Sequence, residues 1–540
     1  MRDHIFRSRN TLSMIKQMIC AGLWMVLLLV VLAPAQSLAE GVPRHIPTWA
    51  YDGGYGGQTD GTGAYSTNDA SKRHMQTWLS YGEGAVDING HPQKSYYDCY
   101  SGGACKSVFS YNPGLLFSSC WPHSEFISEN SDEAYYLHDT EPASASTRTS
   151  YQRMACGQLT TVYFPNDLNP AVGQWFARKN FGSLPINTNT LVFQDDSGPS
   201  CSRFHHGDAW IGPVELRGGA GCDANLTRAL RTVADQQKWP NGTPVGVVAN
   251  AFGLGHFKTA NTSILGLIAP GSNIVGGIAE DDQIYASTFT PQSVYGDVNT
   301  ASLVYAENPA ALYVILHTAN PSPGSTMSCV DGQNNTEVAC GALQLRRDAL
   351  ASFWLAYQAG RTVLWDNFNF SGGDCCGGKQ SLAVYPEESI YPADPVRPLR
   401  PFVSGVASSN GSGCGANPGA GGIQSFVVAC GTLNDGSTPA GVYVREFRRC
   451  YNFGDLIGSG QCAVVMNTTN AAIALQPAWF TQPYSHSMTI GSGAINGGDV
   501  LTAGCGDAKC PISALNPLGL GLALGSARVP AFDAIFLFHS

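Results

Sequence analysis

The chain has 540 residues and a formal net charge of −10 at pH 7, and 13% of its residues are charged. An acidic chain with so few charges lacks the basic surface that neutralises phosphates, so we expect no nucleic-acid partner. Its length suits a barrel domain of ordinary size joined to one smaller domain.

The first 39 residues have the order of a secretory signal peptide. Basic residues come first, an almost unbroken apolar run spans residues 18–35, and a small-x-small cleavage site ends at Ala39. We therefore expect cleavage near Ala39 and an exported protein that is secreted, periplasmic or held at the cell surface. An uncleaved anchor is the alternative, because the run is about as long as one membrane-spanning helix. No second apolar run of that length follows, so we expect no integral membrane span after cleavage.

The cysteines also favour export. Of the 17 cysteines, Cys20 lies in the leader, which leaves an even number. In an exported chain this predicts a disulfide framework, whereas zinc is disfavoured because no paired C-x-x-C spacing occurs. Closeness in sequence suggests the pairs Cys99/Cys105, Cys201/Cys222, Cys329/Cys340, Cys414/Cys430, Cys450/Cys462 and Cys505/Cys510. Cys120 and Cys156 suit a longer loop, and the adjacent Cys375 and Cys376 suit either a mutual bridge or distant partners.

The segments along the chain differ in character. Residues 40–75 form an irregular N-terminal segment with no clear element. From residue 76 to residue 396, short apolar runs alternate with helical patterns. Such runs are typical of strands buried on both faces of a parallel sheet. The clearest are 191–193, 245–248, 274–278, 312–316 and 362–365, and earlier runs at 78–81 and 108–111 suit the first strands.

The alternation of strands and helices predicts an α/β fold, a (β/α)8 TIM barrel. Asn169 suits a helix N-cap with Pro170 behind it, Asp223 suits the N-cap of a second helix, and a third helix is expected over 345–359. An open doubly wound sheet is the alternative, but no nucleotide-binding glycine motif follows an early strand. From 397 to 540, proline and Gly/Ser-rich turns separate short strands with no helix between them. This predicts a C-terminal antiparallel β-domain of sandwich-like type.

Carboxylates follow three of the predicted strands. Asp195 and Asp196 directly follow one strand, Glu280 follows another and Asp366 a third. Barrel enzymes carry their catalytic residues at the C-terminal ends of the strands. Glycoside hydrolysis needs two carboxyl groups in different protonation states. Glu280 with Asp195 or Asp196 is the predicted catalytic pair, and the alternative for each residue is a turn former or an N-cap.

Aromatic residues near these strand ends are candidates for stacking on sugar rings, because an aromatic face suits the apolar face of a pyranose. His317 ends another predicted strand and suits a hydrogen bond to a sugar hydroxyl. Packing within the core or rim is the alternative for each of these residues. The predicted substrate-binding residues are Trp210, Tyr285, Trp365, His317 and Asp366.

Several short motifs occur in a familiar order, at residues 135–139, 164–170, 191–196, 276–280, 443–447 and 464–470. The order resembles that of TIM-barrel glycoside-hydrolase-like families related to the α-amylase and α-galactosidase barrels. The last two segments are similar to the R-x-F and V-N-P-T strands of the C-terminal β-domain in such enzymes, with Thr468 where that pattern has proline. The resemblance implies a poly- or oligosaccharide substrate, paired-carboxylate catalysis and no cofactor.

Two other functions stay open. One is a secreted protein that binds glycans without cleaving them. The other is a metal-dependent polysaccharide deacetylase, which uses an Asp and two His around a divalent metal. Residues 193–199 with His205 and His206 faintly fit that pattern. Because these histidines are adjacent and the strand lies in the middle of the domain, we expect hydrolysis without a metal.

Overall fold

A computed structural model describes residues 48–51, 84–87, 107–113, 120–155, 158–182, 186, 190–195, 197–201, 212–250, 262–280, 288–289, 291–317, 326–330, 337–366, 390–400, 427–432, 439–452, 455–457, 459–488, 516–517 and 527–539. At several strand ends, among them the candidate site, it describes the backbone alone.

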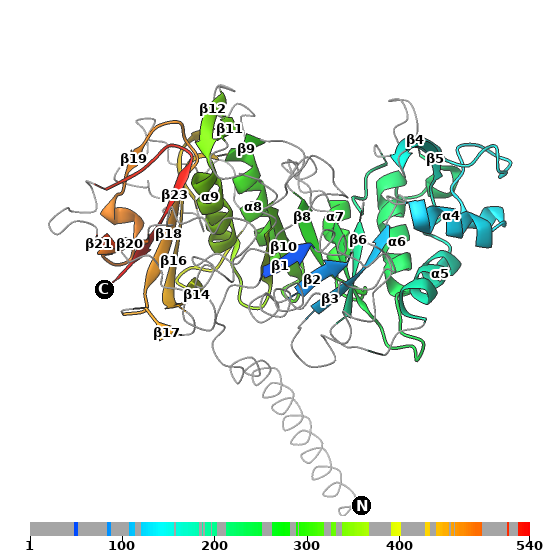
Figure 1. The fold of residues 1–540 in the computed structure, drawn as a ribbon, viewed down its shortest axis with the longest axis horizontal. Coiled ribbons are helices and arrows are strands. Elements are labelled where there is room, and N and C mark those ends of the chain that lie inside the picture. The colour runs from blue at the N-terminus through cyan, green and yellow to red at the C-terminus, as the bar shows by residue number, and fades with distance from the viewer. Residues whose placement is uncertain are drawn as a thin grey trace, which may run out of the picture. The chain divides into compact units, whose positions relative to one another are not determined.

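Parallel strands form the central sheet (Figure 1). They pair in the order β1-β13-β10-β8-β7-β6-β3-β2, and β1 pairs with both β13 and β2, so that the order returns to its start. Their mostly apolar sequences suit burial on both faces. The strands are β1 (Thr48–Tyr51), β2 (Gly84–Asp87), β3 (Ser107–Pro113), β6 (Thr190–Asp195), β7 (Gly246–Asn250), β8 (Ile274–Glu280), β10 (Leu312–His317) and β13 (Thr362–Asp366).

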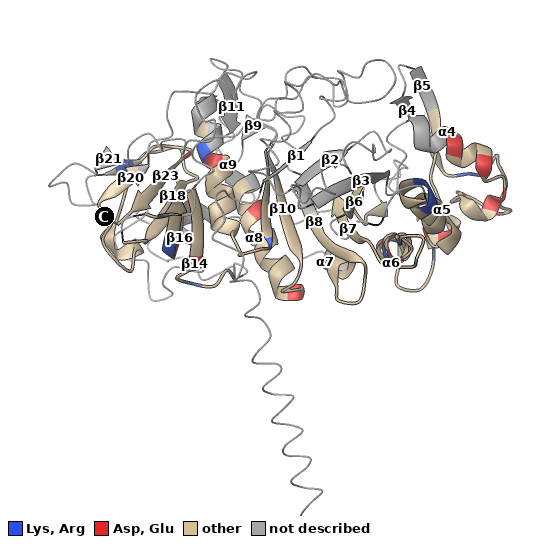
Figure 2. Ribbon diagram, turned by 60° about the horizontal axis from the view of Figure 1, so that its bottom comes forward, with Lys and Arg blue, Asp and Glu red and all other residues tan. Residues whose placement is uncertain are grey.

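Helices connect consecutive strands from β3 onwards, and each packs against the next (Figure 2). They are α5 (Pro170–Phe181), α6 (Cys222–Asp235), α7 (Thr262–Ile268), α8 (Pro291–Glu307) and α9 (Ala342–Ala356). Val192, Val247, Tyr313 and Leu364 of the strands are buried in one core with helix residues such as Leu230. We call the side of the sheet that carries these four strand residues the helix face, and the opposite side the inner face.

Two predicted helix caps have different outcomes. The prediction for Asn169 is confirmed, because its side chain accepts a hydrogen bond from the backbone N–H of Ala171 and Pro170 begins α5. The prediction for Asp223 was wrong, since α6 already begins at Cys222. The Asp223 carboxylate instead accepts a 2.8 Å hydrogen bond from the backbone N–H of Cys201. The disulfide bond between Cys201 and Cys222 brings that N–H to the start of the helix.

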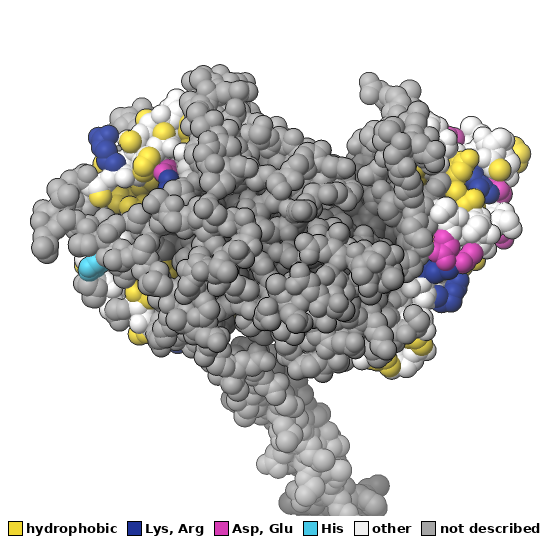
Figure 3. Space-filling view, in the orientation of Figure 1, with side chains coloured by type: hydrophobic (Ala, Val, Ile, Leu, Met, Phe, Trp, Pro, Cys, Tyr) yellow, Lys and Arg dark blue, Asp and Glu magenta, His cyan; other side chains and the backbone are white. Residues whose placement is uncertain are grey.

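A separate layer lies between β3 and α5 in the sequence. It consists of α4 (Cys120–Glu129), the 3₁₀ turn η2 (Glu133–Tyr135) and the antiparallel pair β4 (Ser150–Ala155) and β5 (Gln158–Tyr163). Phe126 and Trp175 meet edge to face in its core, with ring centroids 5.1 Å apart. On its outside, Lys179 forms ion pairs with Glu125 and Glu129. Figure 3 shows acidic and basic side chains side by side at this end of the described surface.

An antiparallel β-domain follows the parallel sheet. One side of its main sheet packs on α9, and the other buries Leu475, Trp479 and Val529. The main sheet consists of β14 (Ile390–Pro395), β15 (Val427–Thr432), β16 (Pro439–Asn452), β17 (Asp455–Leu456), β18 (Cys462–Asn467), β20 (His486–Met488), β21 (Asn516–Pro517) and β23 (Asp533–Phe538). Two smaller sheets complete the described strands of these regions. One, in the C-terminal part, pairs β19 (Ile473–Ala474) with β22 (Arg528–Val529). The other precedes β13 in the chain and pairs β11 (Thr326–Val330) with β9 (Thr288–Phe289) and β12 (Glu337–Gly341).

The α/β domain and the C-terminal antiparallel β-domain are therefore confirmed, but their limits differ from those expected. β1 lies inside the segment 40–75, which showed no element, because its four residues lack the β-branched run of the other strands. β2 spans Gly84–Asp87, and the expected run at 78–81 lies outside the described residues. β14 precedes residue 397 yet pairs with β16, so the C-terminal sheet begins at Ile390. In the described ranges, no helix is long and apolar enough to cross a membrane.

Candidate functional site

The strand register assigns each position of the parallel sheet to a face. Buried Phe193 pairs with Val248, and Val314 pairs with Val363. These four residues do not belong to the core shared with the helices, and they therefore mark the inner face. Because side chains alternate along a strand, every second position beyond them also lies on the inner face.

Two predicted carboxylate positions share the inner face at the C-terminal edge of the sheet. Asp195 is the last residue of β6 and lies two positions beyond Phe193. Glu280 is the last residue of β8 and pairs with Leu316, which lies two positions beyond Val314. β6 and β8 are the fourth and sixth strands of this sheet along the chain, with β7 between them. The catalytic roles of Asp195 and Glu280 stay predictions, and Asp196 lies outside the described residues.

The other predicted strand-end residues divide between the two faces. Trp365 pairs with Leu316, so its position shares the inner face with that of Glu280. His317 pairs with Asp366, and both positions belong to the helix face. The register therefore favours Trp365 for a direct contact with a substrate. Trp210 and Tyr285 lie outside the described residues.

Sequence reasoning did not single out the polar residues around β7. The backbone N–H of Ser197 donates a 3.0 Å hydrogen bond to the carbonyl of Asn250, the last residue of β7. The Ser197 hydroxyl donates a 2.9 Å bond to the carbonyl of Gln194. Asn250 is buried, and the register puts it on the inner face between the positions of Asp195 and Glu280. A polar residue that ends an otherwise apolar strand is the signal that identifies it.

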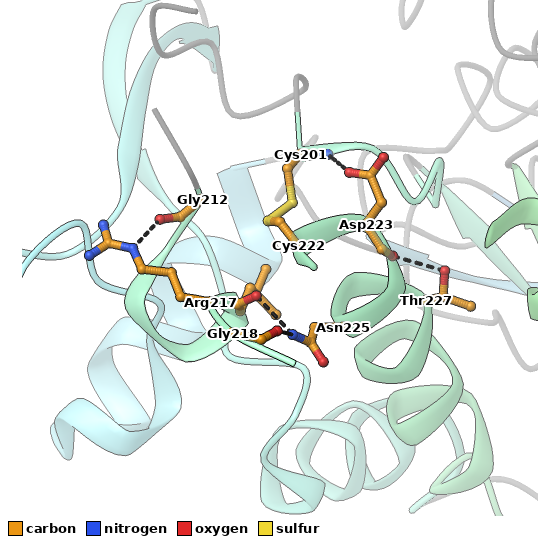
Figure 4. The surroundings of a disulfide bond; sticks show 9 residues. Cys201, Gly212, Arg217, Gly218, Cys222, Asp223, Asn225 and Thr227 are labelled. Carbon is orange, nitrogen blue, oxygen red and sulfur yellow. Dashed lines mark hydrogen bonds between the residues drawn. A yellow bond between two sulfur atoms is a disulfide. The ribbon is translucent and has the colours of Figure 1, made fainter. Parts of the chain in front are cut away.

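A disulfide bond anchors the loop that follows β6 (Figure 4). The Cα atoms of Cys201 and Cys222 are 6.1 Å apart. Gly212 has a φ of +97°, and a side chain at this position would overlap the sulfur of Cys222. The Nε of Arg217 donates a 2.8 Å hydrogen bond to the carbonyl of Gly212. Contacts thus fix Cys201 and Gly212, the two described residues that flank segment 202–211.

The motif at residues 135–139 connects the inserted layer to the same loop. His138 is buried, and its Nδ1 lies 2.6 Å from a carboxylate oxygen of Glu215 in the 3₁₀ turn η4 (Val214–Leu216). Its Nε2 lies 3.1 Å from Glu133, which also accepts two hydrogen bonds from Arg148. These contacts give the motif a structural role, since they connect the inserted layer to the loop after β6.

Asp167, in the motif at 164–170, is a buried carboxyl that sequence reasoning did not single out. Neither of its oxygens has a hydrogen-bond partner among the described residues. Burial raises the pKa of Asp167 well above its usual range, because the charged carboxylate is disfavoured away from water. Asp167 precedes α5, which leads into β6. The sequence feature that could have drawn attention to Asp167 is the turn formed by Pro165 and Asn166.

A metal site finds no support in the described part of the chain, where no group of three or more His, Cys, Asp and Glu side chains is arranged to hold an ion. His205 and His206, on which the deacetylase alternative depends, lie outside that part. The test of the deacetylase alternative is therefore the effect of a chelator on activity.

Comparisons with known proteins give only distant likenesses. No protein-family model matches the chain, and no curated protein does. Among solved structures, Amy13B of Eubacterium rectale is 9% identical with a TM-score of 0.39, and the match covers 94% of this chain and 99% of that one. A family GH13_31 enzyme is 10% identical with a TM-score of 0.42, over 92% and 99% of the two chains. A debranching enzyme of Nostoc punctiforme is 8% identical with a TM-score of 0.32, over 92% and 98%. Likenesses at this level assign no activity to this chain.

Proposed function

We propose that this protein is an exported glycoside hydrolase on a (β/α)8 barrel. It cleaves a glycosidic bond in a poly- or oligosaccharide with Glu280 and one of Asp195 and Asp196. The observation that carries the proposal is the register of the parallel sheet, in which Asp195 and Glu280 end β6 and β8 on the same face. Two carboxyl groups across one cleft can hold different protonation states at one pH, as this reaction requires.

The spacing of the strands is compatible with the reaction. Neighbouring strands lie about 4.8 Å apart, so the backbones of β6 and β8 are about 10 Å apart across β7. Side chains on the inner face of a barrel converge towards its axis. Their carboxyl groups can therefore approach to about 5 Å, which favours retention of configuration, or stay about 6.5–9.5 Å apart, which leaves room for an inverting water.

The remaining residues have supporting roles in this proposal. Trp365 stacks on a sugar ring from the inner face, and Asn250 lies between the two carboxylate positions as a hydrogen-bond partner for a hydroxyl or a carboxylate. The further predicted substrate contacts are Trp210, Tyr285, Asp366 and His317. No cofactor takes part.

Export is supported by two observations. Residues 1–39 have the order of a signal peptide, and the expected pairs Cys201–Cys222 and Cys450–Cys462 are disulfide-bonded. Disulfide bonds persist mainly in oxidising compartments outside the cytosol. The other proposed cysteine pairs each include a side chain outside the described residues.

A panel of polysaccharides and oligosaccharides tests the proposed activity. The mature protein is incubated with each glycan, with and without a chelator, and new reducing ends and released acetate are measured. We expect new reducing ends from at least one glycan, unchanged by the chelator. Acetate release that the chelator abolishes and a divalent metal restores would favour the deacetylase. Binding on a glycan array without any product would favour the glycan-binding protein.

A further inference from the structure

β8 contains one residue more than its neighbour β7 can pair with. β7 pairs Val247 with Ile274 but Val248 with Gly276, so Val275 has no place in the ladder. Such a β-bulge is uncommon between parallel strands. It also shifts the alternation of faces by one position, and every residue after it changes sides.

The contacts of the described side chains agree with this register. Ile274 packs in the core between sheet and helices, which puts it on the helix face. The methyl groups of Val275 lie 3.1 and 3.2 Å from where a Cβ on Gly246 would sit. Gly246 is two positions before Val248, on the inner face. Val275 therefore faces inwards, and Gly276, level with Val248, occupies an inner-face position as well.

The bulge decides on which face β8 ends. Glu280 lies an even number of residues after Ile274. In a strand without the bulge, it would therefore lie on the helix face together with Ile274. The observed pairing with β10 instead puts position 280 on the inner face, because Glu280 pairs with the inner-face position Leu316. Ala279 pairs with Ile315, a residue of the sheet–helix core, and therefore takes the helix face. The bulge thus exchanges the faces of positions 279 and 280.

Gly276 is the residue that permits the bulge. A Cβ at this position would overlap the carbonyl oxygen of Leu312 in β10 and lie 2.6 Å from its Cβ. Backbone atoms cannot move aside by a change of rotamer, so a larger residue at this position is incompatible with the bulged backbone of β8.

We infer that the bulge at Val275 and Gly276 sets the inner-face position of Glu280, which makes Gly276 a positioning residue for the catalytic carboxyl. The inference rests on the proposed function for what Glu280 does, but the position can be measured without any activity.

Thiol labelling at positions 279 and 280 measures the two faces directly. Glu280→Cys and Ala279→Cys are made separately, and the folded proteins react with a small charged thiol reagent before peptide mass analysis. Because a barrel opens to solvent at its C-terminal edge while helices cover the outer face, we expect position 280 to react about tenfold faster than position 279. In the Gly276→Ala background β8 loses the bulge and slips by one residue, and this ratio reverses. Deleting Val275 in addition removes the extra residue, and the parental ratio returns.

The labelling ratios and the activity of Glu280→Gln distinguish failure of the positioning from failure of the proposed function. Equal labelling at 279 and 280 in the parent, or an unchanged ratio in Gly276→Ala, overturns the inference. If Gly276→Ala does not fold by circular dichroism, the variant that also lacks Val275 decides. The parental ratio in that variant supports the inference, and its failure to fold overturns it. If labelling follows the prediction while Glu280→Gln stays fully active, the positioning stands and the proposed function fails. Loss of activity in Glu280→Gln with unchanged labelling ratios removes the positioning and keeps the function.

Discussion

The guanidinium of Arg445 donates a 2.5 Å hydrogen bond to the carbonyl oxygen of Leu355, in the last turn of α9. Arg445 is buried and comes from β16 of the C-terminal domain, so one domain caps a helix of the other. A positive charge at a helix C-terminus is favourable. Burial nevertheless lowers the pKa of Arg445 to about 10. Two residues on, Phe447 meets Trp354 of α9 edge to face, with ring centroids 5.6 Å apart. The R-x-F segment thus attaches the β-domain to α9.

The first prediction concerns this cap. Arg445→Met keeps most of the side-chain volume but leaves the Leu355 carbonyl without its donor, and we expect it to lower the free energy of unfolding by about 1–3 kcal/mol. Arg448→Met, at an exposed position of the same strand, is the matched control and should change little. Urea unfolding at pH 7 measures both. An unchanged midpoint for Arg445→Met would mean that the cap adds nothing to stability.

The second prediction concerns acid stability. Hydrogen bonds from Arg148 lower the pKa of Glu133 to about 2 from its ordinary 4.5. Since the folded-state pKa lies below the unfolded one, Glu133 stabilises the fold above about pH 4.5, and this stability is lost as the pH falls towards 2. Glu133→Gln should therefore lose less Tm than the wild type between about pH 5 and pH 3. Glu141→Gln, at an exposed position, should follow the wild type. Parallel curves for Glu133→Gln and wild type would contradict this prediction.

The third prediction concerns the disulfide bonds. The Cys201–Cys222 bridge closes a loop with a sequence separation of 21. Replacing both cysteines by serine should cost about 3 kcal/mol, mainly because the unfolded chain gains freedom. We also expect about six or more bridges in the mature protein, on the basis of its even cysteine count. Thiol titration of the unfolded, unreduced protein should find few free thiols. Finding most of them free would reject the framework.

Local chemistry explains which elements could be predicted. Asn169 followed by Pro170 identifies a helix start on its own, since both residues act within one turn. Asp223 is also a good N-cap residue by type, but no proline follows it, and the Cys201–Cys222 bridge, a contact between distant residues, gives its carboxylate another donor. β1 and β14 depend on pairing with strands far along the chain, and their short sequences carry too few β-branched residues to mark them.

The candidate site shows the same limit. Asp195 and Glu280 could be predicted as strand-end residues, because each follows an apolar run directly. Their faces could not be predicted, since the face of Glu280 depends on the bulge at Val275, and the only local hint is the Gly276–Gly277 pair. The register likewise separates Trp365 from His317 and Asp366, although all three follow apolar runs in the same way.

Turnover by Glu280→Gln shows whether Glu280 carries acid/base chemistry on a glycosidic bond. The amide keeps the shape of the side chain but cannot exchange a proton. On the glycan that the panel identifies, we expect kcat to fall by about a hundredfold or more while Tm and glycan affinity stay near wild type. Asp195→Asn or Asp196→Asn, but not both, should have the same effect, and Glu307→Gln, exposed at the end of α8, should keep full activity. Full activity in Glu280→Gln would mean that Glu280 is not the catalytic acid or base.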